Sequence, residues 1–147
     1  GAKLQLFERR LIFLKPDALI VLDRIRLAEP ADLELRFHTE HPVKAPGENR
    51  FTAVGRNAKL RFELLTPPGL TSATAITRMG GSADTPDKRM HGVRLKRRSA
   101  EWINAVALSW SEKDGDPPRV RMRREGDRWG FGTGDGFAFV EVKTEAQ

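Results

Sequence analysis

The arrangement of arginines is the feature of this sequence that points most directly to chemistry. Arg119, Arg121 and Arg123 stand at every second position, so they would share one face of a β-strand. A planar guanidinium binds a carboxylate or a sulfate through two parallel hydrogen bonds, which suits an acidic polysaccharide. Trp129 follows closely and could stack its ring against a pyranose. The alternative is a solvated sheet face that discourages edge pairing, with Trp129 in the core.

The overall charge agrees with an anionic partner. The 147 residues include 26 Lys and Arg against 20 Asp and Glu, a formal net charge of +6. Lys88 to Arg98 adds a second basic segment, which contains no acidic residue. This charge favours acidic glycans, nucleic acid or a membrane surface, although it could also serve solubility alone.

Two of these three partners are not expected. Stacking on nucleic-acid bases needs several exposed aromatic rings among the basic residues, and Trp129 is the only such ring close to the arginine row. The sequence also fits no recognised nucleic-acid-binding module. No apolar run approaches the roughly 18 residues that are needed to cross a bilayer. We therefore expect no nucleic-acid partner and no membrane partner.

The residue types that the chain lacks narrow its chemistry further. It contains no cysteine and no tyrosine. A disulfide, a thiolate metal site and a phenol acid or base are therefore excluded within this chain. Three histidines remain as imidazole groups: His38, His41 and His91.

These side chains would be positioned by β-strands, because apolar and polar residues alternate between turn signals along most of the sequence. Strands are predicted over Leu4–Leu14, Ala18–Ile25, Leu33–Thr39, Arg50–Val54, Ala58–Leu65, Ser72–Met79, Glu101–Ser111, Arg119–Arg124, Arg128–Phe131 and Phe137–Val142. Residues 80–91 are predicted as a loop. We predict one all-β domain over residues 1–147, an antiparallel two-sheet β-sandwich of about ten strands.

The same alternation predicts the core. The apolar side chains that would face inward are Ile20, Leu22, Phe37, Phe62, Leu64, Val106, Leu108 and Phe139. Trp102, Trp110 and Phe137 are also expected to pack in the core rather than to bind sugar.

Several short stretches near the start of the chain carry a family resemblance. They are FERR at Phe7–Arg10, FLKPD at Phe13–Asp17, LIVLDR at Leu19–Arg24 and FHT at Phe37–Thr39, followed by Ala58–Pro67. In this order they resemble the segment that opens the C-terminal β-sandwich of heparinase II/III-like polysaccharide lyases. The last 60 residues resemble that domain in their β character alone.

The resemblance implies that this chain is the C-terminal part of a larger bacterial enzyme, periplasmic or secreted. In such lyases an α/α toroid carries most of the catalytic groups, and the sandwich forms part of the cleft wall. They cleave uronate-containing acidic polysaccharides by β-elimination, usually with tyrosine and histidine as acid and base. Because this chain has no tyrosine and no toroid, we expect it to hold no catalytic residue and to be inactive alone.

The resemblance also implies a metal ion, usually zinc, held in the sandwich by histidine and aspartate. Asp23 and His38 match two of these ligands, and their oxygen and nitrogen atoms suit zinc. His41, water or another domain would have to complete the shell. The alternative is that Asp23 pairs with Arg24 or Arg10, while His38 is a half-exposed strand residue.

A different class of function would give the same fold, namely a free-standing carbohydrate-binding or structural β-module without catalysis. The two hypotheses differ in what accompanies the chain. A reading frame that continues upstream into a few hundred helical residues would favour the lyase.

Overall fold

The computed structural model describes residues 3–47, 49–66, 71–79 and 88–143, and the regular elements of these residues are all β-strands. They are β1 (Leu4–Leu14), β2 (Ala18–Thr39), β3 (Val43–Gly47), β4 (Arg50–Val54), β5 (Ala58–Leu64), β6 (Thr71–Met79), β7 (Lys88–Glu112), β8 (Arg121–Glu125), β9 (Arg128–Gly132) and β10 (Ala138–Glu141). The predicted all-β class is confirmed. The described residues include no helix that is long and apolar enough to span a membrane.

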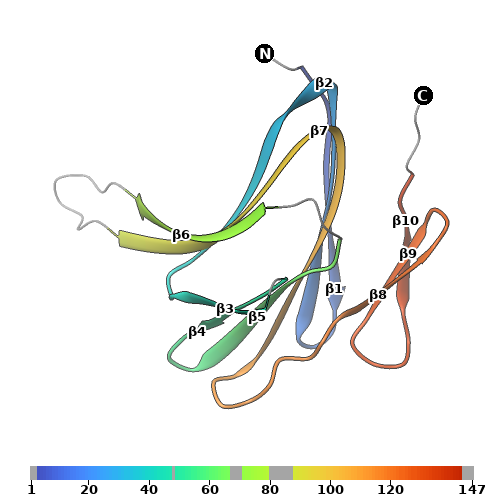
Figure 1. Cartoon of the computed structure of the whole chain (residues 1–147). Helices are drawn as coiled ribbons and strands as arrows, with labels where there is room; N and C mark the ends of the chain where they lie inside the picture. Colours follow the sequence, from blue (N-terminus) through green and yellow to red (C-terminus); the bar gives the residue numbers. More distant parts are fainter. Residues whose placement is uncertain (1–2, 48, 67–70, 80–87, 144–147) are drawn as a thin grey trace.

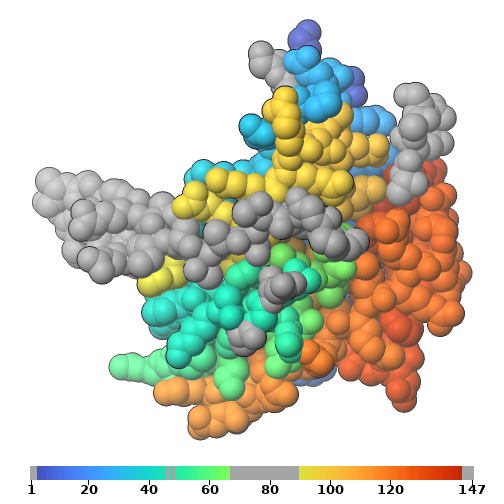
Figure 2. Space-filling model, viewed as in Figure 1, coloured from blue at the N-terminus to red at the C-terminus, as the bar shows by residue number. Residues whose placement is uncertain are grey.

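The strands form two antiparallel sheets. The large sheet has the order β1-β2-β7-β5-β4-β3, with β6 paired to β7, and the small sheet has the order β10-β9-β8. In Figure 1, β2 and β7 run side by side and curve over, while the small sheet lies next to β1. Figure 2 shows the small sheet, in orange and red, as a block packed against the remainder of the chain. The predicted two-sheet arrangement is therefore confirmed.

β2 is much longer than the sequence pattern predicted. The two segments that were predicted as separate strands, Ala18–Ile25 and Leu33–Thr39, both belong to β2. Its register against β7 shifts between Arg26 and Ala31. Such an irregularity bends a strand and increases its twist, so one strand can serve both halves of a folded-over sheet.

β7 is longer too. It begins at Lys88 rather than at Glu101, because the basic segment pairs with β2 on one side and with β6 on the other. Within this segment Val93 and Leu95 are buried, whereas residues 96–98 are exposed. The predicted loop is therefore wrong for residues 88–91, and residues 80–87 lie outside the described residues.

The central strands of the large sheet carry buried side chains on both faces. On one face, Ile20 and Leu22 of β2 pack with Trp129 and Phe131 of the small sheet. On the other face a second cluster forms where the sheet folds over itself, and Trp102 lies in it. Full burial of each large apolar side chain contributes roughly 1.5–3 kcal/mol, so these two clusters are the main source of stability.

The predicted core is confirmed in most positions. Five of the eight residues are buried, and these are Ile20, Leu22, Phe62, Leu64 and Val106. Phe37 and Leu108 are half-buried and pack against the folded-over cluster. Phe139 is also half-buried, but it lies on the outer face of the small sheet, as described below.

Candidate functional site

The outer face of the small sheet gathers the predicted arginines. Along β8, Met122 packs inward onto the core, and Arg121 and Arg123 are exposed on the opposite face. This follows from the period of two along a strand. Arg119 is exposed as well and lies just before β8.

Glycines in β9 leave room beside these arginines. Arg121 lies opposite Gly132, and Arg123 lies opposite Gly130. The ring of Phe139 fills the space over Gly130, where an added Cβ would stand 2.7 Å from it. A larger residue at Gly130 would displace this ring from the sheet surface.

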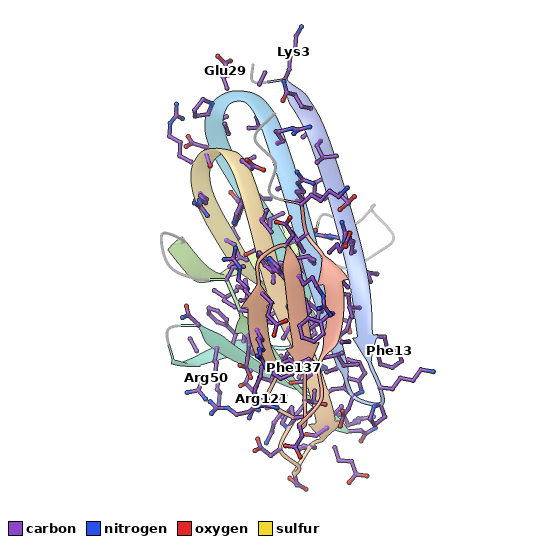
Figure 3. All side chains as sticks on the ribbon, turned by 90° about the vertical axis from the view of Figure 1, so that its right-hand side faces the viewer. Lys3, Phe13, Glu29, Arg50, Arg121 and Phe137 are labelled. Carbon is purple, nitrogen blue, oxygen red and sulfur yellow. The ribbon has the colours of Figure 1, made fainter. Side chains whose placement is uncertain are left out.

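Two of the guanidinium groups make cation–π contacts with phenylalanine rings. The guanidinium carbon of Arg121 lies 5.0 Å from the centre of the Phe137 ring, and that of Arg128 lies 4.4 Å from the centre of the Phe139 ring. Arg121 also donates a hydrogen bond to the carbonyl of Gly134. Figure 3 shows Arg121 and Phe137 near one end of this sheet. Contacts of this kind reduce the freedom that a guanidinium loses when it binds an anion.

We call this surface the arginine–phenylalanine face, and its cations and rings are Arg121, Arg123, Arg128, Phe137 and Phe139. Glu125 lies on the same face, and its Oε1 is 2.9 Å from Nε of Arg123, so an acidic ligand would compete with this ion pair. It joins a groove of about 500 Å³, which is lined by Phe137, Lys15 and the glycine-rich segment after β9. That volume falls in the usual range for small-ligand sites. Lys15 is exposed and adds a cation away from the face. The arrangement can therefore bind an acidic ligand that extends over several groups.

Trp129 does not belong to this face, so the alternative position in the core is the one observed and the stacking platform is not. Its side chain is 2% exposed and packs inward between the sheets. Arg124 covers it, with the guanidinium carbon 4.4 Å from the ring centre. Phe137 and Phe139 were expected in the core and are the aromatic residues that accompany the arginines instead. Arg128, Gly130 and Gly132 stand at every second position of β9, so one face of this strand has no large apolar side chain. This pattern in the sequence could have indicated the face.

The predicted metal ligand Asp23 is engaged in another interaction. It is 0% exposed, and both of its carboxylate oxygens accept hydrogen bonds from Arg9, at 2.6 Å from Nε and 2.8 Å from Nη2. These hydrogen bonds raise the pKa of Arg9 above its ordinary value, although partial burial lowers it. The expected alternative partners were wrong, since Arg10 pairs with Glu8.

A zinc ion does not fit these residues. Arg9 already neutralises Asp23, whereas His38 is exposed on its strand. Across the described residues, no three His, Asp or Glu side chains gather closely enough to hold a metal. A metal at Asp23 would have to displace a bidentate ion pair from a fully buried carboxylate, which is costly.

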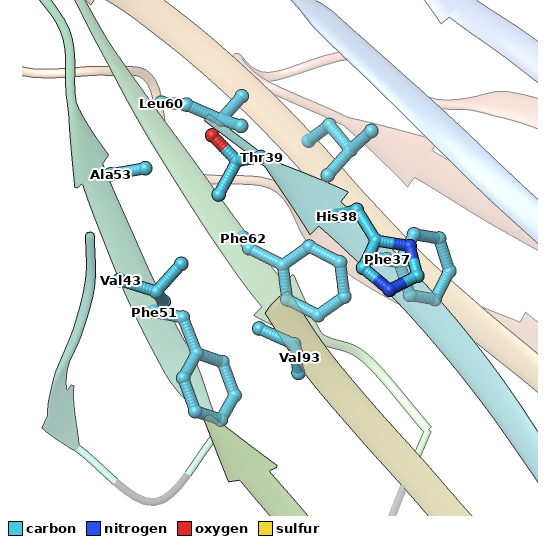
Figure 4. A pocket seen from close by; sticks show the side chains of 10 residues that line it. Phe37, His38, Thr39, Val43, Phe51, Ala53, Leu60, Phe62 and Val93 are labelled. Carbon is cyan, nitrogen blue, oxygen red and sulfur yellow. The ribbon is translucent and has the colours of Figure 1, made fainter. Parts of the chain in front are cut away.

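A separate cavity of about 120 Å³ lies inside the fold of the large sheet (Figure 4). Phe37, Phe51 and Phe62 line it from β2, β4 and β5, with Val93 from β7. His38 and Thr39 are the polar residues in its lining. Apart from these two residues its walls are apolar, and it is small, so it does not suit an acidic sugar.

No protein-family model matches the chain, and no curated protein matches it in sequence. Solved structures do match its fold. A mutant of the heparan sulfate lyase HepC from Pedobacter heparinus covers 95% of this chain with a TM-score of 0.74 and 10% identity. The chain has the fold of one part of that lyase. Heparinase III covers 97% with a TM-score of 0.65 and 10% identity.

The heparinase resemblance, which was strongest near the start of the sequence, is thus confirmed as a resemblance of fold over nearly the whole chain. The chain spans only 24% of the HepC structure and 27% of the heparinase III structure. It therefore corresponds in extent to a domain of those enzymes.

Proposed function

We propose that this chain is the accessory β-sandwich of a heparinase-like polysaccharide lyase, and that the arginine–phenylalanine face forms part of its cleft wall. The supporting observation is the match of 95% of the chain to about a quarter of a heparan sulfate lyase. In this proposal the substrate is a uronate-containing acidic glycan, and an α/α toroid of the same polypeptide supplies the acid and base for β-elimination.

The chemistry of the face supports an acidic glycan as its ligand. Guanidinium groups bind carboxylates and sulfates, and charge-assisted hydrogen bonds are stronger than neutral ones. Phe137 and Phe139 stand beside Arg121 and Arg128, so apolar ring surface is available next to the charges. A pyranose presents the same combination, with C–H groups on its faces and acidic groups at its rim. The role of this chain would be to orient the glycan rather than to transform it.

A binding measurement tests the face. We expect the triple change Arg121→Gln, Arg123→Gln and Arg128→Gln to weaken binding of a heparan sulfate oligosaccharide about tenfold or more, measured by calorimetry, because several charge-assisted hydrogen bonds are lost.

The matched control removes the same charge from exposed positions of β7, with Lys96→Gln, Arg97→Gln and Arg98→Gln. We expect it to change affinity by no more than about threefold, since these residues do not line the groove and would act only through screened charge. Equal losses in both variants would show that net charge alone attracts the glycan.

The lyase itself is tested on the longer polypeptide that this proposal requires the reading frame to encode. Ultraviolet absorbance of the unsaturated uronate product would be followed on heparan sulfate, heparin and alginate. The proposal requires activity on at least one of them, with a raised KM in the triple arginine variant. Binding by the face without any eliminase activity in the longer polypeptide would favour a carbohydrate-binding module instead.

A further inference from the structure

β1 combines exposed apolar side chains with an open backbone edge. Phe7, Leu11 and Phe13 are 51%, 64% and 52% exposed. β1 ends the large sheet, and within the described part of the chain it pairs with β2 alone. Figure 3 shows it as the outermost ribbon on its side of the molecule. A strand edge of this kind presents unpaired N–H and C=O groups to any strand that can match it.

The sequence of β1 matches itself when it is reversed about Arg9. We propose that a second copy of this chain pairs with this edge, so that two β1 strands run antiparallel across a two-fold axis at Arg9. In this register Glu8 faces the partner's Arg10, Phe7 faces the partner's Leu11, and Leu6 faces the partner's Ile12. Opposite charges and apolar pairs across neighbouring strands stabilise a sheet.

Neighbouring symmetric registers match less well. An axis at Glu8 or at Arg10 sets like charges opposite each other, which is destabilising. The axis at Arg9 brings two copies of that residue together, but each guanidinium is neutralised by the bidentate pair with Asp23. Its one poor match sets Gln5 against the partner's Phe13.

The dimer goes beyond the proposed function and does not depend on it, because the arginine–phenylalanine face lies on the small sheet; Phe13 and Leu14 at the end of β1 also line the groove beside that face. Pairing of β1 with itself uses the same edge in both copies, so the contact closes at two chains. It would join two large sheets into one and set Phe7 and Leu11 of each copy beside Leu11 and Phe7 of the other.

Charge-reversal variants test the register. We expect the wild-type chain to sediment at micromolar concentration as a dimer of about 33 kDa, twice the chain mass of 16.5 kDa. Glu8→Arg and Arg10→Glu should each be monomeric, because like charges then meet across the axis. An equimolar mixture of the two variants should regain the dimer, since one strand then carries two cations and the other two anions.

The mixture separates this contact from folding effects. Within a chain, Arg10 pairs with Glu8 at 2.8 Å, and each single variant loses that pair whether mixed or not. Circular dichroism of each variant checks that the fold is kept. A monomeric wild type, or a mixture that stays monomeric while the wild type dimerises, would overturn the proposal.

Discussion

At the scale of single residues, the buried carboxylate of Asp23 requires a charged partner on a neighbouring strand. A buried charge requires a partner of opposite charge, and Arg9 provides it from the neighbouring strand. Asn104 lies opposite Asp23 on β7 and accepts a hydrogen bond of 2.9 Å from Thr66. Asp23 and Asn104 are therefore neighbours across β2 and β7, with Arg9 bound to the first and Thr66 to the second.

The partner of Asp23 could have been predicted from the hairpin alone. Strands were predicted up to Leu14 and from Ala18, and with Leu14 opposite Ala18 the register places Arg9 opposite Asp23. Arg10, one of the two alternative partners predicted for Asp23, lies opposite Leu22 in this register. Its side chain belongs to the opposite face of β1, so it could not reach Asp23.

Removal of Arg9 should be costly. We expect Arg9→Met to lower the free energy of unfolding by roughly 2–3 kcal/mol, less than for a fully buried pair because the Arg9 side chain is 41% exposed. The cause is the unpaired charge left on Asp23. The double change Arg9→Met with Asp23→Leu should recover most of the loss, because an apolar pair replaces the ionic one. Urea denaturation measures both, and a double variant no more stable than Arg9→Met would contradict this explanation.

At the scale of elements, the short hairpins were predictable and the long strands were not. Arg50–Val54 and the strand after it follow from local alternation and a turn between them, and both are confirmed. β2 continues through Arg26–Ala31 because it pairs with β7 on either side of a register shift. Local sequence cannot predict this, since the pairing involves residues far along the chain. β3 was not predicted, because it is only five residues long and includes Pro46, which is unfavourable inside a strand.

The small sheet depends on a close backbone approach at Gly132. An added Cβ there would overlap the carbonyl oxygen of Gly136, a backbone atom that cannot rotate away. We expect Gly132→Ala to lower the free energy of unfolding by about 2–3 kcal/mol through overpacking. Gly134→Ala is the matched control in the same segment, because no atom lies within 4 Å of its added Cβ. Its effect should stay within about 0.5 kcal/mol in thermal unfolding, and equal effects at both positions would refute this account.

At the scale of the whole molecule, the sequence predicted the class of fold better than the positions of individual side chains. Net charge and the arginine alternation point to an anion without any knowledge of topology. The combination of Phe137 with Arg121 is different, because it joins residues of β8 to the segment before β10 through the packing of the small sheet. Hydrophobicity assigns such rings to the core, and only the pairing of β9 with β10 places Phe139 over Gly130.

The last prediction concerns the activity of the chain by itself. β-Elimination needs a base at C5, a neutralised carboxylate and an acid at the leaving oxygen, all positioned around one sugar. The arginine–phenylalanine face offers cations that could neutralise the carboxylate, but arginine does not exchange protons near neutral pH. The chain has no tyrosine, and the described lining of the groove includes no histidine. We therefore expect the purified chain to bind heparan sulfate oligosaccharides and yet to release no unsaturated uronate, with an active heparan sulfate lyase as the positive control. Unsaturated product that forms in proportion to the concentration of this chain would show that it carries an acid and a base of its own.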